Sequence, residues 1–265
     1  MNKDILKEIH EHILKISTIR RAENNKWFFK CRPGEYGEND KFVGLTVPQT
    51  RKLVRVYKNL SLSETERLLK SEIHEERLLA LLILVEKFEK EEYKTEIFNL
   101  YLKNLKYVNS WDLVDMSAPK IVGEYLKVKY SLKSKNCSGV KFLKSLASDK
   151  NLEGKNWKEK LWQKRIAIVS TLAFTQKPFK NYYAPDIIFE VLDKILKEKD
   201  EINSHDLIQK ASGWMLREYA KRVNEEKMKG FLLKNFKNIK NRRILLRYAI
   251  ERMTKEERQY WLNKK

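Results

Sequence analysis

The segment SLSETERLLKSEIHEERLLALLILVEKFEKEEYKTEIFNLYLKNL, residues 61–105, decides the fold class. Its apolar residues recur at i, i+3, i+4 and i+7, the spacing of one face of a helix. Ser61 and Ser63 each stand three residues before a glutamate, Glu64 and Glu66, a pattern typical of helix N-termini. Strand-like alternation of polar and apolar residues is essentially absent. The segment therefore predicts consecutive helices.

The same helical spacing continues through the 265-residue chain, which has only eight glycines and five prolines. With helices of about 11–12 residues, this predicts an all-α chain of roughly a dozen helices. The least helical stretch, residues 28–49, holds three of the glycines and two of the prolines. We expect one domain with a helical hairpin at 1–30, a loop at 31–47 and helical repeats at 48–265. The first of these helices has Thr46 as its cap and Pro48 in its first turn.

The chain is strongly basic. Its 56 Lys and Arg residues exceed its 36 Asp and Glu residues and give a formal net charge of +20. Residues 101–265 carry +18, whereas residues 61–100 carry −4. This balance indicates a polyanionic partner. Nucleic acid is the partner expected first, and an anionic membrane surface is the second candidate. Lysines spread over solvated helix faces would give the same total, and this alternative stays open.

No metal site or membrane segment is indicated. Cys31 and Cys137 stand alone, and the four histidines lack metal-ligand spacing. The N-terminal residues are charged throughout, unlike a signal peptide, and no apolar run reaches about 18 residues. We therefore expect a cytoplasmic protein with reduced thiols, no cofactor and no membrane association.

Four segments share one pattern, a basic residue followed by a tightly apolar helix with small residues. They are EERLLALLIL with Arg77, QKRIAIVSTL with Arg165, IQKASGWML with Lys210, and NRRILLRYAI with Arg243. The spacings of 88, 45 and 33 residues fit repeats of roughly 33–47 residues with one step skipped, the size of HEAT-like helix pairs. If these helices stack side by side, the four basic residues line one concave, basic face. Alternatively, each side chain caps or snorkels from its own helix.

The segment NSWDLVD, residues 109–115, carries two carboxylates and an indole. On a helix, Trp111 and Asp115 project from one face because they are four residues apart, while Asp112 points about 100° away. Asp112 in the first turn is expected to stabilise the helix dipole, with Asn109 or Ser110 as the cap. Trp111 and Asp115 on a basic surface are suited to holding a cation between them. A structural Asp115, satisfied by a lysine or a backbone N–H group, is the alternative.

Taken together, these segments resemble the AlkD-type DNA alkylation repair enzymes, a family of bacterial DNA glycosylases. The resemblance lies in GLTVPQTRKL, HEERLLALLIL, NSWDLVD, WQKRIAIVST and LIQKASGWMLREYAKR, which occur in the family's order over about residues 40–222. It implies a right-handed superhelical solenoid of HEAT-like helix pairs whose concave, basic face holds duplex DNA. It also implies hydrolysis of the N-glycosidic bond of cationic alkylated purines such as 7-methylguanine and 3-methyladenine.

The resemblance assigns roles to individual residues. Trp111 and Trp214 match the tryptophans that contact the deoxyribose and backbone at the lesion, and Asp115 matches the catalytic aspartate. Arg165 matches an arginine near the phosphates, and Arg217 matches a backbone-contacting arginine. Taken by themselves, Trp214 would be a core residue and Arg165 a surface residue of their helices.

The expected partner is double-stranded DNA with alkylated bases, bound by a monomer without an obligate protein partner or a cofactor. The second hypothesis is a non-catalytic solenoid that binds damaged or branched DNA, with salt-sensitive binding and no base release. A third is a protein-interaction scaffold, which the charge of +20 disfavours.

Overall fold

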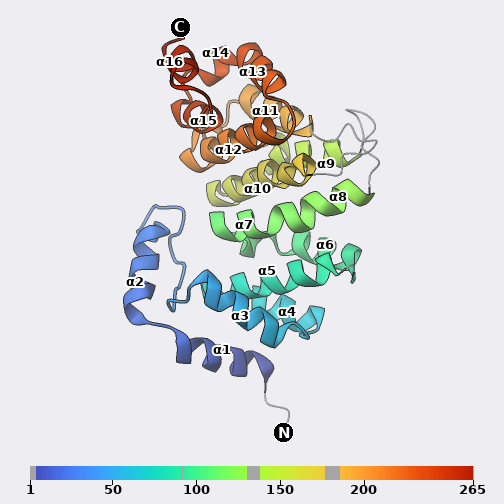
Figure 1. The fold of residues 1–265 in the computed structure, drawn as a ribbon. Coiled ribbons are helices and arrows are strands. Elements are labelled where there is room, and N and C mark those ends of the chain that lie inside the picture. Colours follow the sequence, from blue (N-terminus) through green and yellow to red (C-terminus); the bar gives the residue numbers. More distant parts are fainter. Residues whose placement is uncertain (1–3, 91, 130–137, 177–185, 265) are drawn as a thin grey trace. The chain divides into compact units, whose positions relative to one another are not determined.

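The computed structural model describes residues 4–90, 92–129, 138–176 and 186–264, so Cys137 lies outside the described residues. Within these ranges the only β-structure is an isolated bridge between Lys41 and Ile73, and the predicted all-α class is confirmed. The chain divides into two compact units, Met1–Ser117 and Ala118–Lys265 (Figure 1). None of the helices in the described ranges has the length and apolar character needed to cross a membrane.

The first unit is built from helices α1 to α7. Their bounds are α1 Ile5–Ile16, α2 Ile19–Phe28, α3 Val47–Tyr57, α4 Leu62–Leu69, α5 His74–Glu89, α6 Lys94–Lys103, the 3₁₀ helix η1 Leu105–Tyr107, and α7 Trp111–Ala118. Two predicted helix starts are confirmed as reciprocal capping boxes. Thr46 pairs with Gln49 at the start of α3, where Pro48 lies in the first turn, and Ser61 pairs with Glu64 at the start of α4.

Helix α5 forms the core of the first unit. Every residue from Leu78 to Val85 is buried, as expected for a helix that is apolar on all sides. The polar first turn of α5, His74 to Arg77, is buried as well. Since buried polar groups need partners, this turn must be satisfied by other parts of the unit.

Glu75 provides one such contact by holding the segment that precedes α3. Its carboxylate accepts hydrogen bonds from the backbone N–H groups of Val43, Gly44 and Leu45 at 3.1, 2.8 and 3.2 Å. Gly44 has φ +94°, and a Cβ atom there would overlap the Thr18 carbonyl oxygen. The loop is therefore fixed against both α5 and the start of α2.

The second unit contains the remaining helices. Their bounds are the π-helix η2 Pro119–Gly123, α8 Glu124–Lys129, α9 Ser138–Ala147, η3 Asp149–Leu152, α10 Trp157–Ser170, η4 Thr171–Thr175, α11 Ile187–Lys197, η5 Glu201–Ser204, α12 Asp206–Arg222, α13 Glu225–Lys234, α14 Phe236–Ile239, α15 Arg243–Ala249 and α16 Lys255–Asn263. Helix α10 is the core element here, because every residue from Leu161 to Ser170 is buried.

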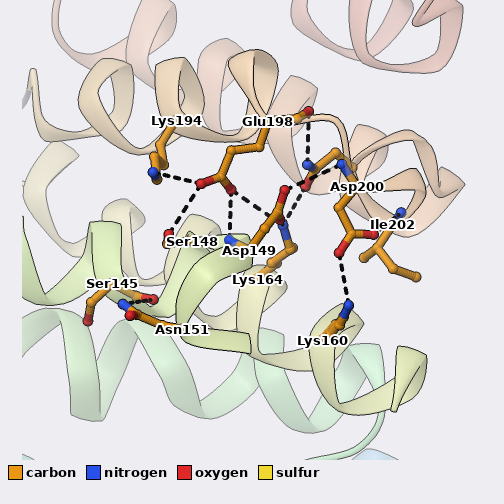
Figure 2. Close-up of polar contacts among 11 residues, drawn as sticks. Ser145, Ser148, Asp149, Asn151, Lys160, Lys164, Lys194, Glu198, Asp200 and Ile202 are labelled. Atoms are coloured by element: carbon orange, nitrogen blue, oxygen red, sulfur yellow. Dashed lines mark hydrogen bonds and ion pairs between the residues drawn. The ribbon is translucent and has the colours of Figure 1, made fainter. Parts of the chain in front are cut away.

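A buried lysine joins four elements of the second unit, as Figure 2 shows. The Lys164 side chain has no exposed surface; it donates to Asp149 and to Asn203 Oδ1, the latter at 2.7 Å. Glu198 closes the network by accepting from the backbone N–H of Asp149 at 2.9 Å and from Ser148 at 3.2 Å. A buried ammonium requires such partners, so the network fixes α10 against η3, η5 and the end of α11.

Helices α12 and α15 pack closely at a glycine. A Cβ atom at Gly213 would overlap the Leu245 carbonyl oxygen and lie 2.5 Å from the Tyr248 Cβ atom. Only glycine permits this approach without a shift of α15. The contact fixes the part of α12 that carries Trp214.

Candidate functional site

Helix α7 presents Trp111 and Asp115 one turn apart. Both side chains are partly exposed, whereas Asp112, Leu113 and Val114 between them are buried. Residues four apart on a helix share a face, so the indole and the carboxylate lie on the same side of α7. Burial raises the pKa of the Tyr101 hydroxyl, and the Asp115 carboxylate raises it further.

Aromatic residues of the N-terminal segment hold the Trp111 indole. The Phe29 ring stacks on it with the ring centroids 5.2 Å apart and an angle of 11° between the planes. Phe28 contacts it edge-on at 5.7 Å and 75°. Phe29 also stacks on Phe42, at 4.9 Å, so the indole is the end of a continuous aromatic stack. This packing restricts the orientation of the indole beside Asp115.

A buried network of charges fixes the N-terminus of α7. His74 Nε2 donates to Asp112 Oδ2 at 2.8 Å, and His74 Nδ1 donates to Asp40 Oδ2 at 2.8 Å. Arg77 Nη2 donates to Asp40 Oδ1 at 2.6 Å. Two cations therefore balance two carboxylates within one buried cluster, which joins α5, α7 and the loop before α3.

The pKa values of the cluster agree with this charge assignment. Burial lowers the pKa of His74, but Asp112 and Asp40 outweigh it and raise the pKa to about 9. Burial raises the pKa of Asp112 and of Asp40, and their cationic partners reverse that change and lower both values. His74 is consequently protonated at neutral pH and both of its ring nitrogens donate. Asp112 does lie in the first turn of α7, as predicted, but its chief partner is His74 rather than the helix dipole.

The structure places two predicted phosphate contacts inside their units. Arg77 is 3% exposed and pairs with Asp40, and it also donates to the Ser71 carbonyl at 3.0 Å. Arg165 is 5% exposed and donates from Nη1 to the Leu207 carbonyl at 2.6 Å, which joins α10 to the first turn of α12. Both placements differ from the exposed positions expected on a basic face. Each guanidinium is buried because it donates a hydrogen bond to a group distant in sequence, Asp40 for Arg77 and the Leu207 carbonyl for Arg165.

Helix α12 presents three predicted residues on one face. Lys210, Trp214 and Arg217 follow the i, i+4, i+7 spacing, and all three are partly exposed. Lys210 pairs with Asp206 at 2.8 Å, and Arg217 pairs with Glu251 of the loop after α15. Trp214 is thus accessible in part rather than being wholly a core residue.

Arg243, the eighth predicted residue, begins α15 and is exposed, and it donates to the Leu262 carbonyl of α16 at 2.8 Å. The structure therefore brings Trp111 and Asp115 together on α7, and Lys210, Trp214 and Arg217 together on α12. Arg243 lies on a separate element of the second unit.

Sequence analysis missed Phe28, Phe29 and His74. The signal for the first two was the run Trp27-Phe28-Phe29 at the end of an otherwise polar helix. The signal for His74 was a run of four ionisable residues at the start of α5, directly before its apolar stretch. Among the described residues no group of three or more His, Cys, Asp or Glu side chains could hold a metal ion.

Comparison with known proteins bears on this arrangement. A family model described as DNA alkylation repair enzyme matches residues 9–253, which include both α7 and α12. Neither a curated protein nor a solved structure matched the chain. Because the family match spans most of its length, the chain belongs to the DNA alkylation repair enzyme family.

Proposed function

We propose that the protein is a monofunctional DNA glycosylase that removes cationic alkylated purines, such as 7-methylguanine and 3-methyladenine, from duplex DNA. The observation that carries the proposal is the pair on α7, in which a partly exposed carboxylate lies one turn from an indole held by the Phe29 stack. Family membership supports a DNA substrate.

The chemistry of the substrate explains why one carboxylate is sufficient. Alkylation at N7 or N3 makes the base positively charged and hence a good leaving group, so little general-acid help is needed. As the glycosidic bond breaks, positive charge develops on the sugar, as in glycoside hydrolysis. Asp115 would stabilise this charge and orient the attacking water, and the product is the free base with an abasic site.

The Trp111 indole would act on the same developing charge. Aromatic faces attract cations through their quadrupoles, and an indole is the strongest of the natural side chains in this respect. Trp111 would contact the lesion's deoxyribose beside Asp115. We propose that Trp214 contacts the sugar–phosphate backbone of the bound DNA.

DNA binding would use the basic residues that remain accessible. We propose that Lys210, Arg217 and Arg243 contact phosphates, and that the helices pair as HEAT-like repeats with these residues on a basic face. The excess charge of +18 in residues 101–265 supports a polyanion there. Arg77 is not proposed as a DNA contact. Arg165 is proposed as a positioning residue, since its bond to Leu207 holds the helix that carries Trp214.

Base release from methylated duplex DNA tests the proposal. Purified protein should release free 7-methylguanine, identified chromatographically, and leave an abasic site without strand cleavage. DNA binding that weakens with salt, without any base release, would instead support the non-catalytic DNA-binding alternative. Strand cleavage accompanying release would contradict the monofunctional assignment.

A further inference from the structure

Helix α2 carries two aromatic side chains that stay largely exposed in the folded unit. No residue of α2 is buried, and Trp27 and Phe28 are 66% and 55% exposed. Single exposed apolar residues are common on proteins, but two adjacent large rings form a patch. Trp27 and Phe28 are called the α2 aromatic pair below. Their exposure requires a reason other than the folding of α2.

Polar contacts account for how α2 is held. Arg21 Nη1 donates to the Gly44 carbonyl at 3.3 Å, and Asn25 Nδ2 donates to the Glu75 carboxylate at 3.5 Å. The backbone N–H of Thr18, the cap residue, also bonds to the Gly44 carbonyl, at 3.4 Å. These contacts fix α2 to the loop before α3. The aromatic pair therefore lies on a helix whose position in the first unit is fixed.

Phe28 of the α2 aromatic pair packs against Trp111. Phe28 lies 5.7 Å from the Trp111 ring and 5.3 Å from the Phe29 ring, in edge-on contact with both. Trp27 directly precedes Phe28 in the sequence, and the centroid of its indole lies 5.6 Å from the Lys30 Nζ atom. The Phe28 ring of α2 and the Trp111 ring of α7 are therefore in contact one helical turn from Asp115, and Trp27 is the adjacent residue of α2.

The same segment of the chain carries exposed cations. The exposed basic residues of α2 and the turn after it are Arg20, Lys26, Lys30 and Arg32. Aromatic rings on which bases or sugars lie, together with cations that bind phosphates, are the two features of sequence-independent binding to nucleic acid strands. The chemistry of the patch therefore matches a polynucleotide.

A membrane surface fits less well. A helix that lies in a membrane interface needs a continuous apolar face along its length. In α2 the exposed Ile19 is at one end and the aromatic pair at the other, with the exposed Glu23 and Asn24 between them. The apolar patch extends toward α7 instead.

We infer that Trp27 and Phe28 contact DNA, each packing on the sugar or an unstacked base of a nucleotide next to the one at Trp111 and Asp115. This inference rests on the DNA substrate of the proposed function. The aromatic pair would contribute binding affinity and would hold the strand in register with Asp115. Its ligand class is a deoxynucleotide within a strand.

Replacement of each ring by leucine in the full chain tests the inference. Trp27→Leu and Phe28→Leu should each raise the Kd for a fluorescein-labelled duplex with a tetrahydrofuran abasic analogue by about fivefold or more, as expected for loss of one stacking contact. Trp27→Phe keeps a ring and should retain most of the affinity. Tyr93→Leu is the matched control, because Tyr93 is an equally exposed aromatic residue, 57%, at the N-cap of a different helix, α6, and it should leave Kd unchanged.

The salt dependence of binding separates stacking from charge. Trp27→Leu should weaken binding equally at all salt concentrations, whereas Lys30→Gln should lower the slope of log K against log salt by about one unit. Circular dichroism and thermal melts establish that each variant is folded. An unchanged Kd in both leucine variants, or an equal loss in Tyr93→Leu, overturns the inference.

Other occupants would give distinct results. If the leucine variants lose binding to phosphatidylglycerol vesicles or lose self-association in sedimentation, while DNA affinity is kept, the inference is wrong. Binding is measured separately from base release. A wild-type protein that binds DNA without releasing a base therefore ends the proposed glycosylase activity and leaves the test of the aromatic pair intact, while a failure to bind DNA ends both.

Discussion

His74 Nε2 lies 2.8 Å from Asp112 Oδ2, and both side chains are buried directly behind the helix turn that carries Trp111 and Asp115. The first prediction concerns this pair. His74→Gln leaves a buried carboxylate without its cation and should lower the free energy of unfolding by about 3–5 kcal/mol. Urea denaturation measures the change. His10→Gln is the control, because His10 pairs with Glu76 at 2.8 Å but is 41% exposed, and it should cost about 1 kcal/mol or less. Equal losses in the two variants would contradict the account.

The same pair predicts how stability depends on pH. The pKa of His74 is raised from 6.5 to about 9 on folding, so its contribution is complete below pH 6.5 and is lost as the pH rises through 9. The pKa values of Asp40 and Asp112 are lowered, so their contributions are present above pH 3.8 and are lost on acidification. The stability difference between wild type and His74→Gln should shrink by about 3 kcal/mol from pH 6 to pH 10. A difference that stays constant over this range would refute the charged state of His74.

These contacts show why part of the site escaped sequence analysis. The helix starts at Ser61 and Thr46 were predictable because their partners, Glu64 and Gln49, are three residues away. Local spacing also placed Trp111 and Asp115 on one face of a helix. The partners of Arg77 and Arg165, in contrast, are Asp40 and the Leu207 carbonyl. A helical pattern gives no information on partners 37 or 42 residues away, so both arginines were expected to be exposed.

The stack of Phe29 on Trp111 predicts an energetic coupling between the two rings. A double-mutant cycle with Phe29→Leu and Trp111→Leu should give a coupling of about 0.5–1.5 kcal/mol in the free energy of unfolding. Phe29→Leu should also slow base release, because the indole beside Asp115 loses its support. The same cycle with Trp157→Leu, a residue of the other unit, should be additive. Additivity between Phe29 and Trp111 would show that the stack does not hold the indole.

The contact of α12 with α15 predicts opposite effects of two glycine substitutions. Gly213→Ala forces a Cβ atom onto the Leu245 carbonyl oxygen and should destabilise the fold by about 1–3 kcal/mol. Gly230→Ala, in α13, meets no atom within 4 Å and should stabilise it by about 0.5–1 kcal/mol. Thermal denaturation distinguishes the two. A stable Gly213→Ala variant would mean that α15 is not packed against α12 at this point.

The role of Asp115 has the most direct test, the single-turnover rate of 7-methylguanine release from methylated duplex DNA. Asp115→Asn should reduce this rate by about 100-fold or more and leave DNA affinity intact, because a preorganised charge beside the sugar is lost while the binding surface is kept. Glu96→Gln, which removes an exposed carboxylate from α6, is the matched control and should release the base at the wild-type rate. Release by Asp115→Asn at the wild-type rate would contradict the central claim.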